Sequence, residues 1–397
     1  MKIVFLAPFG IRPKGTLIAR MIPLAAEFQD IGHQVVIVAP PYTNPEDTGK
    51  TELVNGVVIR NIKLGPEHKV LAAPLLAWRM FSTAFSEKPD IVHLFKPKGY
   101  GGLAAMLHII LQRLGLRLSP LLLDTDDWEG YGGMNELHSY SGVEKSFYAF
   151  QEQWLLKRAF AVTVASRALE SMVAGIGVSQ NRIFYLPNCI TERVPNAHPY
   201  VLREHLGIKK DSPVVLLYTR FFEFSQDKLY FLFTEIARAL PEVRFLVVGK
   251  GRNNEEERLF NFAREEGFAD ALVMAGWVEP DKLADCLSVG DVAIYPFADT
   301  LVNRTKCPAK LTELLLLERA VVADAVGQIS EYIKSDVSGV LCSPDNWTEM
   351  AQRTVELLKN PLQRDKLGSA GRRYLLENFR WSKFAENLLL LYKNILK

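Results

Sequence analysis

Short apolar runs rich in β-branched residues alternate along this chain with longer stretches whose apolar residues recur at helical spacing. Runs that are apolar throughout are typical of strands buried on both faces of a sheet. Thr16 is predicted to cap the helix that follows the first run. The predicted strands of the first half are 2–7, 34–39, 57–62, 91–95, 121–124, 161–165 and 184–186. This alternation predicts the α/β class, with a doubly wound parallel sheet.

The alternation restarts after a polar segment, 187–199, whose prolines are typical of an interdomain linker. Further strands are predicted at 214–218, 244–248, 272–275, 292–295, 320–323 and 339–342. Helices are predicted at 229–240, 255–266, 280–288, 310–317, 347–359, 361–378 and 382–396. We therefore expect two Rossmann-like domains, 1–195 and 196–381, facing across a ligand cleft, with the helix 382–397 packing back on the first.

The composition excludes several classes of protein. The 397 residues include 47 Lys and Arg and 45 Asp and Glu, which excludes binding driven by bulk positive charge, so we expect no nucleic-acid partner. The four cysteines form no closely spaced pair, and no signal peptide or membrane-length apolar run is evident, which indicates a cytoplasmic chain. The apolar segments 70–80 and 103–116 carry arginines, so peripheral contact with a membrane is an alternative to plain packing.

Cationic side chains follow several predicted strands of the second half. Arg220 and Lys228 follow the first, a Gly-Lys-Gly-Arg run (249–252) follows the second, and the loop 296–310 follows the fourth. Ligands of open parallel sheets bind at the carboxyl ends of strands, and such a rim suits a diphosphate. The alternative is a solvated basic edge.

Glu313 lies in the apolar stretch 311–317, where an unpaired carboxylate is costly to bury. Pro308, just before it, suits a first helical turn. The carboxylate could accept two hydroxyls, as a ribose offers, or it could pair with Arg319 or a lysine. Spacing does not decide between these hypotheses.

Taken in order, the motifs of this chain resemble those of GT-B glycosyltransferases of the retaining family 4 group. The resembling pieces cover nearly the whole chain: Gly15, 32–35, 89–93, 164–166, 186–188, 247–251, 275–278, 308–313, 320–323, 327–333 and the last helix after Trp381. The resemblance implies transfer of a sugar from a nucleotide diphosphate sugar to a hydroxyl, with retention, without a metal and with no other cofactor.

The resemblance also implies roles for single residues. Glu313 matches the second acid of the E-x7-E motif, which binds the nucleotide ribose. Arg220 and Lys228 match the basic pair on the donor diphosphate, where they act in catalysis. Gly15 matches a glycine that lets backbone N–H groups approach the reacting centre. The residues implied to line the nucleotide cleft are Trp277, Val278, Gly249 and Gly251.

The chain departs from the family pattern at two places. Thr305 stands where the first acid of the motif is expected, so backbone N–H groups of 306–309 are expected to replace it. This adds the segment Lys306, Cys307, Pro308, Ala309 and Lys310 to the predicted substrate site. In the first half, Asp126 or Asp127 takes the place of the usual strand-end histidine. We expect these carboxylates to face the donor sugar or the acceptor hydroxyl, the alternative being solvated loop acids.

The acceptor is undetermined: a lipid carrier, a glycan or a small molecule would fit, and the loops expected to hold it are 11–14, 42–49 and 96–102. Three other functions remain open. A G-x-G-x-x-A run at 99–104 with Asp124 downstream fits an NAD-dependent oxidoreductase. Asp124 and Asp126 form a D-x-D pair typical of a metal-dependent transferase. The missing first acid leaves room for a sugar-nucleotide epimerase or a non-catalytic binder.

Overall fold

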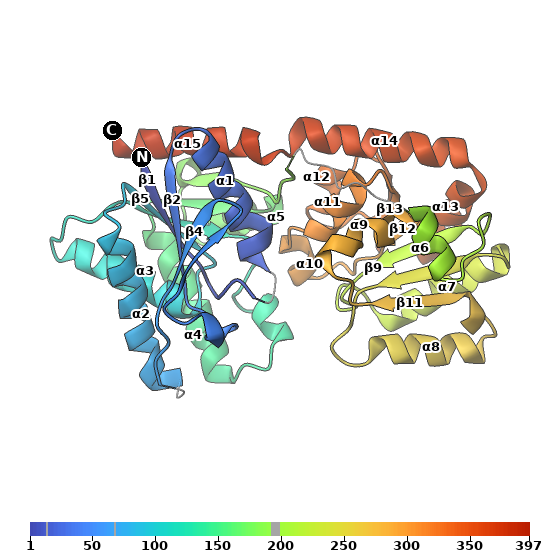
Figure 1. The fold of residues 1–397 in the computed structure, drawn as a ribbon, viewed down its shortest axis with the longest axis horizontal. Helices are drawn as coiled ribbons and strands as arrows, with labels where there is room; N and C mark the ends of the chain where they lie inside the picture. Colours follow the sequence, from blue (N-terminus) through green and yellow to red (C-terminus); the bar gives the residue numbers. More distant parts are fainter. Residues whose placement is uncertain (13–14, 67–68, 192–198) are drawn as a thin grey trace. The chain divides into compact units, whose positions relative to one another are not determined.

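The computed structural model describes residues 1–12, 15–66, 69–191 and 199–397. The chain forms two compact units (Figure 1). Unit 1 comprises Met1–Thr191, Thr305–Cys307 and Phe379–Lys397; unit 2 comprises Glu192–Arg304 and Pro308–Asn378. Most of the predicted linker, 192–198, lies outside the described residues. Among the described residues, none of the helices combines the length and apolar character needed to cross a bilayer.

Unit 1 is built on one eight-stranded sheet in the order β3-β4-β2-β1-β5-β6-β7-β8. Every neighbouring pair is parallel except β3 and β4. The strands are β1 (Lys2–Leu6), β2 (Gln34–Ala39), β3 (Thr51–Val54), β4 (Val57–Asn61), β5 (Ile91–Phe95), β6 (Leu121–Thr125), β7 (Ala161–Val164) and β8 (Ile183–Tyr185).

Helices cover this sheet because its strands are apolar on both faces. The α-helices in the described part of unit 1 are α1 (Ile22–Asp30), α2 (Lys69–Ser86), α3 (Gly99–Arg113), α4 (Gly142–Arg158), α5 (Arg167–Gly175) and the C-terminal α15 (Trp381–Leu396). A π-helical segment, η1 (Leu17–Met21), leads into α1. α15 packs against α1, and its Trp381 and Tyr392 are buried in the same core as Phe5 and Phe28.

Unit 2 has a fully parallel six-stranded sheet in the order β11-β10-β9-β12-β13-β14. Its strands are β9 (Val214–Tyr218), β10 (Arg244–Val248), β11 (Leu272–Gly276), β12 (Val292–Tyr295), β13 (Ala320–Asp324) and β14 (Val340–Cys342). Its helices are α6 (Pro199–His205), α7 (Gln226–Ala239), α8 (Glu255–Glu265), α9 (Pro280–Ser288), α10 (Leu301–Thr305), α11 (Ala309–Leu316), α12 (Ile329–Tyr332), α13 (Trp347–Lys359) and α14 (Pro361–Asn378).

The prediction of a doubly wound α/β chain with two parallel sheets is therefore confirmed, and most predicted strands agree with observed strands to within one or two residues. Two local predictions were wrong or incomplete. Strand β3 was not predicted, although Asn55 and Gly56, both with positive φ, form the two-residue turn that joins it to β4. Thr16 is no helix cap, because its backbone is already helical and its hydroxyl donates to Asp126 instead.

Candidate functional site

At the carboxyl edge of the unit 2 sheet, polar groups follow the ends of neighbouring strands. Arg220 follows β9 and is exposed. Gly249 and Gly251 follow β10, the strand next to it. Trp277 and Val278 follow β11; Trp277 is 65% exposed and Val278 is half-buried. This edge therefore brings together an exposed guanidinium, two glycines and an exposed aromatic ring.

Gly249 is a glycine for a steric reason. Its φ is +119°, and a Cβ built there would lie 1.9 Å from the carbonyl oxygen of Thr219. Its N–H donates to the carbonyl oxygen of Gly276 at 2.7 Å. A side chain at this position would push the end of β10 away from the end of β9, so the close approach of the two loops depends on Gly249.

Glu313 lies on α11 and is exposed rather than buried, which corrects the expectation of a carboxylate inside an apolar stretch. Its neighbours on the helix, Leu311 and Leu314, are the residues that enter the core. Tyr218 is hydrogen-bonded to Glu313; burial and then this carboxylate raise the pKa of the Tyr218 hydroxyl. Arg319, the suggested ion-pair partner, donates instead to the carbonyl oxygens of residues 288, 290 and 317.

Lys310 lies beside the same tyrosine. Its Nζ is 3.6 Å from the centroid of the Tyr218 ring and 3.3 Å from the carbonyl oxygen of Thr219. Tyr218 therefore contacts both predicted α11 residues, and Lys310, Tyr218 and Glu313 form one continuous group at the end of β9. This group combines a cation, a hydroxyl and a carboxylate next to the exposed Arg220.

Lys228 is at this sheet edge too, but its charge is not exposed. Its Nζ is 2.6 Å from Asp324 Oδ2 and 2.9 Å from the carbonyl oxygen of Pro344. Burial raises the pKa of Asp324 to about 6, and Lys228 opposes that rise. A diphosphate that binds Lys228 must therefore compete with Asp324 for the ammonium group.

The predicted basic rim is only partly assembled. Arg304 is exposed and forms an ion pair with Asp299, with its Nη2 2.7 Å from Asp299 Oδ2. Lys306 and Cys307 lie in the short segment that belongs to unit 1.

Pro308 is the residue before the first turn of α11 rather than within it. It has no N–H, so the segment 306–309 has three backbone donors, from Lys306, Cys307 and Ala309.

In unit 1, hydrogen bonds hold this short segment in place. The Ser166 hydroxyl donates to the carbonyl oxygen of Thr305 at 2.7 Å. The Asn188 backbone N–H donates to Cys307 Sγ at 3.1 Å, and its side-chain amide donates to the carbonyl oxygen of Cys307 at 2.7 Å. Arg20 donates in turn to Asn188 Oδ1 at 3.3 Å. Thr305 and Cys307 are therefore held by the polar core of unit 1.

That polar core contains a bidentate ion pair between Arg20 and Asp124. The Arg20 guanidinium lies 2.6 Å and 2.7 Å from the two carboxylate oxygens, and both side chains are almost fully buried. Thr163 also donates to Asp124 at 2.5 Å. Asp124 is thus already bonded on both oxygens, which leaves it poorly suited to a nicotinamide-nucleotide ribose or to a D-x-D metal site.

Lys96, at the end of β5, holds the predicted catalytic aspartates. Its φ is +60°, an uncommon backbone conformation for a residue with a side chain. Its Nζ lies 2.9 Å from Asp126 Oδ1, 2.7 Å from Asp127 Oδ2 and 3.3 Å from Glu129 Oε1. Thr16 donates to Asp126 Oδ2 at 2.9 Å. The aspartates are therefore components of a buried ionic cluster and are not solvated loop acids.

The two aspartates have opposite pKa shifts. Burial would raise the pKa of Asp126, but Lys96 and Arg20 outweigh it, so that the pKa is lowered. Burial raises the pKa of Asp127, and Lys96 only partly opposes this. Asp126 Oδ1 accepts no hydrogen bond among the described residues, because its contact with Lys96 lacks hydrogen-bond geometry. This oxygen is itself buried and lies 2.9 Å from Lys96 Nζ, so Asp126 is held within the ionic cluster and does not present Oδ1 to solvent.

Two glycines of the 99–104 run, Gly101 and Gly102, serve close packing, whereas Gly99 has a positive φ of +65° and open space beside it. A Cβ on Gly101 would lie 3.1 Å from the carbonyl oxygen of Ala7, and one on Gly102 would lie 2.5 Å from the Gln151 amide. Gly15, where the described chain resumes after residue 12, is half-buried, and a Cβ there would lie 3.0 Å from the Phe9 ring. Lys14 of the predicted acceptor loop 11–14 lies outside the described residues.

Sequence reasoning missed Arg20 as a site residue, and it included Lys96 only as part of the expected acceptor loop 96–102, without its ion pairs. Arg20 falls among the apolar positions of the first helical segment, and Lys96 follows a buried strand directly. A cation at either place is costly without a carboxylate partner, and that cost was the available signal.

Comparison with known proteins identifies matches along most of the chain. A model described as a glycosyl transferase 4-like domain matches residues 17–189, and one described as glycosyl transferases group 1 matches residues 212–360.

Several curated glycosyltransferases match at low identity, including the following two. The chain is 24% identical over 251 residues to 2-deoxystreptamine glucosyltransferase of Streptomyces kanamyceticus, covering 62% of the chain and 63% of the relative. It is 27% identical over 256 residues to D-inositol 3-phosphate glycosyltransferase of Xylanimonas cellulosilytica, covering 62% of the chain and 60% of the relative. The match thus spans about three fifths of the length of each relative.

The fold is also similar to that of solved glycosyltransferase structures. The crystal structure of Anabaena HepE in complex with UDP-glucose superposes with a TM-score of 0.75 at 17% identity, covering 99% of this chain and 100% of that one. The superposition shows a shared fold, and at 17% identity it shows the fold alone.

Proposed function

Because this chain belongs to the GT-B glycosyltransferases of the family 4 type, we propose that it transfers a sugar from a nucleotide diphosphate sugar to an acceptor hydroxyl, with retention and without a metal ion. The observation that carries the proposal is the group at the end of β9, where the exposed Arg220 lies beside Tyr218 and Glu313.

The donor is assigned to the carboxyl edge of the unit 2 sheet. Glu313, exposed on α11, accepts the ribose hydroxyls, and the exposed Trp277 lies beside the base. Arg220 supplies a fork of donors to the diphosphate, and Lys228 supplies a second charge. A structural neighbour, HepE, was crystallised with UDP-glucose, which supports a nucleotide-sugar donor.

The proposed catalytic roles follow from where charge develops on the donor in the transition state. As the bond from the sugar C1 to the diphosphate breaks, the leaving oxygen gains negative charge and C1 becomes electron-poor. Arg220 and Lys228 stabilise the diphosphate at this stage. Backbone N–H groups of the 306–309 segment hold the sugar in place of the missing first acid. The acceptor proton passes to the leaving oxygen, so that attack occurs on the face from which the diphosphate departs.

Metal independence is supported by the partners of the acidic residues. Asp124 is bonded to Arg20, and Asp126 is bonded to Thr16 and close to Lys96. Protein cations therefore already neutralise the carboxylates that a D-x-D site would use.

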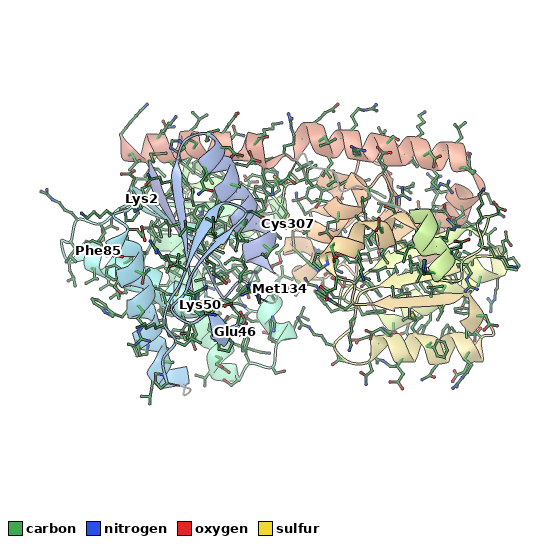
Figure 2. All side chains as sticks on the ribbon, viewed as in Figure 1. Lys2, Glu46, Lys50, Phe85, Met134 and Cys307 are labelled. Carbon is green, nitrogen blue, oxygen red and sulfur yellow. The ribbon has the colours of Figure 1, made fainter. Side chains whose placement is uncertain are left out.

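Peripheral contact with the cytoplasmic face of a membrane is the last part of the proposal. Leu71, Trp78 and Phe85 recur every seven residues on α2 and are each more than half exposed (Figure 2 labels Phe85). α3, which packs against α2, ends near the exposed Leu114 and Arg117. Apolar side chains next to basic ones suit an anionic bilayer surface.

The test is a donor screen followed by an assay. A ligand that binds the native state raises the melting temperature, so UDP, GDP, ADP and their sugars identify the donor. Release of nucleotide diphosphate that requires an acceptor and survives EDTA is the expected result, with the anomeric configuration of the donor kept in the product. Loss of activity in EDTA, or an inverted product, contradicts the corresponding part of the proposal. Co-sedimentation with anionic vesicles, reduced in Trp78→Ala, tests the membrane contact.

A further inference from the structure

Four tyrosines gather at the carboxyl edge of the unit 1 sheet. Tyr42 comes from the loop after β2 and Tyr100 from the start of α3. Tyr140 comes from the segment before α4, and Tyr148 lies within α4. The rings of Tyr42 and Tyr100 are 5.6 Å apart, and those of Tyr140 and Tyr148 are 5.1 Å apart. Tyr42 is 47% exposed, and the other three are half-buried.

The two tyrosine pairs belong to one cluster. Burial raises the pKa of the Tyr42 hydroxyl, and Tyr140, Tyr148, Tyr100 and Glu129 raise it further, so these groups lie near one another. Since nearly half of the Tyr42 side chain is exposed, the burial concerns its hydroxyl end, which lies 3.4 Å from the carbonyl oxygen of Pro8. Aromatic faces with hydroxyl edges suit a ligand that has both C–H faces and hydroxyl groups.

The base of this cluster is ionic. Lys98 Nζ lies 5.7 Å from the centroid of the Tyr140 ring and 2.7 Å from Glu129 Oε2. Glu129 also pairs with Lys96, which contacts Asp126 and Asp127. The tyrosines are therefore linked through Lys98, Glu129 and Lys96 to the buried aspartates.

The charges of this ionic chain are unequal. Two ammonium groups, on Lys96 and Lys98, face three carboxyl groups, on Asp126, Asp127 and Glu129. Cations of the neighbouring loops are also paired: Arg12 and Lys50 both contact Asp47. A phosphate or carboxylate brought here meets no surplus cation among the described residues of the cluster and is repelled by the carboxylates.

On the basis of the proposed function, we infer that the Tyr42, Tyr100, Tyr140 and Tyr148 cluster binds the acceptor, and that the acceptor is a cyclic polyol without negative charge. The ring stacks on the tyrosines, and its hydroxyl groups bond to the tyrosine hydroxyls. Neutral and amino-substituted polyols both fit, whereas a phosphorylated polyol does not.

The test uses glucose, glucosamine and glucose 6-phosphate as matched probes of one ring with different charge. Binding to the full chain is measured without nucleotide, so its outcome is independent of donor chemistry. We expect glucose or glucosamine to bind at least about tenfold more tightly than glucose 6-phosphate, a difference of about 1.4 kcal/mol. Tyr42→Ala and Tyr140→Phe should each weaken that binding several-fold.

Tyr374→Ala, at a half-buried tyrosine of α14 in unit 2, is the matched control and should leave binding unchanged. Tighter binding of the phosphorylated probe, binding of none of the probes, or unchanged binding in both tyrosine variants would overturn the inference. If no nucleotide sugar binds while polyols do, the proposed function fails and the polyol site stands.

Discussion

The ammonium group of Lys228 lies 2.6 Å from Asp324 Oδ2, and both side chains are buried within unit 2. Asp324 Oδ2 also accepts the Phe297 backbone N–H at 2.6 Å, whereas Oδ1 accepts no hydrogen bond among the described residues. The cation predicted to bind a diphosphate is thus neutralised by a carboxyl group with one unsatisfied oxygen, and the two functions of Lys228 compete.

This competition predicts that donor affinity depends on pH. Burial raises the pKa of Asp324 to about 6, and Lys228 opposes the rise. Below that pH the carboxyl is protonated and the Lys228 charge is available; above it the carboxylate holds the ammonium. We therefore expect the Kd of the intact nucleotide sugar, whose diester phosphates do not titrate in this range, to fall several-fold as pH falls through 6.

Asp324→Asn provides the control, because it removes the titration and keeps the shape. The variant should bind the donor with a Kd that does not vary over the same pH range. A wild-type Kd that is flat across pH 6 would contradict a diphosphate role for Lys228 and leave Lys228–Asp324 as a structural ion pair.

Lys96→Met should destabilise unit 1 strongly. It leaves Asp126, Asp127 and Glu129 buried without their shared cation, a loss of about 3–5 kcal/mol for a broken buried pair. Lys50→Met, at an exposed lysine 3.4 Å from Asp47, is the matched control and should cost under about 1 kcal/mol. Urea unfolding curves measure both, and equal effects in the two variants would show that the buried cluster is not stabilised by Lys96.

Glu152→Gln should change the pH dependence of stability. Burial raises the pKa of Glu152 well above its ordinary value, and Glu129 raises it further. The unfolded carboxyl ionises near about pH 4.3, so above this pH folding takes up a proton and wild-type stability falls by about 1.4 kcal/mol per pH unit. The glutamine variant lacks this loss, so its advantage over wild type should grow between about pH 5 and 7.

Glu136→Gln, at an exposed carboxylate, is the control for the Glu152→Gln experiment. Its hydrogen bond to Lys145 lowers the pKa of Glu136, so ionisation there favours folding. Its stability difference from wild type should not grow over the same range. Identical pH profiles for Glu152→Gln and wild type would mean that Glu152 is ionised in the folded protein.

The sequence was sufficient to predict every strand except β3, and the residues that follow the strands at the sheet edges. Buried parallel strands such as β9 and β10 are continuous apolar runs, and whatever follows them, Arg220 or Gly249, must lie at one edge of the sheet. Local patterns are read directly from consecutive residues, so this part of the site could be located without coordinates.

Side-chain pairing could not be predicted in the same way. Lys228 and Asp324 are 96 residues apart, and Arg20 and Asp124 are 104 apart, so no local pattern shows that each cation has a buried partner. Glu313 was expected to be buried because leucines surround it in sequence. A rotation of 100° per residue places it on the solvent side of α11, and only the packing of Leu311 and Leu314 decides which side that is.

Glu313→Ala should weaken nucleotide binding. If the carboxylate accepts two ribose hydroxyls, its removal costs about 1.5–3 kcal/mol, or roughly ten- to a hundredfold in Kd. Tyr218→Phe keeps the carboxylate but removes the hydroxyl bonded to it, so a smaller effect is expected. Calorimetric titration with the nucleotide diphosphate measures both effects. An unchanged Kd in Glu313→Ala would show that Glu313 does not bind the ribose.

Arg220→Ala should mainly lower turnover, because the charge that Arg220 stabilises grows as the diphosphate leaves. Loss of one such donor typically costs about a hundredfold or more in kcat. The donor Kd should change less than kcat, and Arg220→Lys should recover part of the rate because it restores charge without the planar fork. Arg238→Ala, at an exposed arginine of α7 paired with Glu235, is the matched control and should keep the wild-type rate. Steady-state and single-turnover rates separate the two quantities. A full-rate Arg220→Ala enzyme, or equal losses in kcat and donor affinity, would show that Arg220 binds the ground state and does not act on the leaving group.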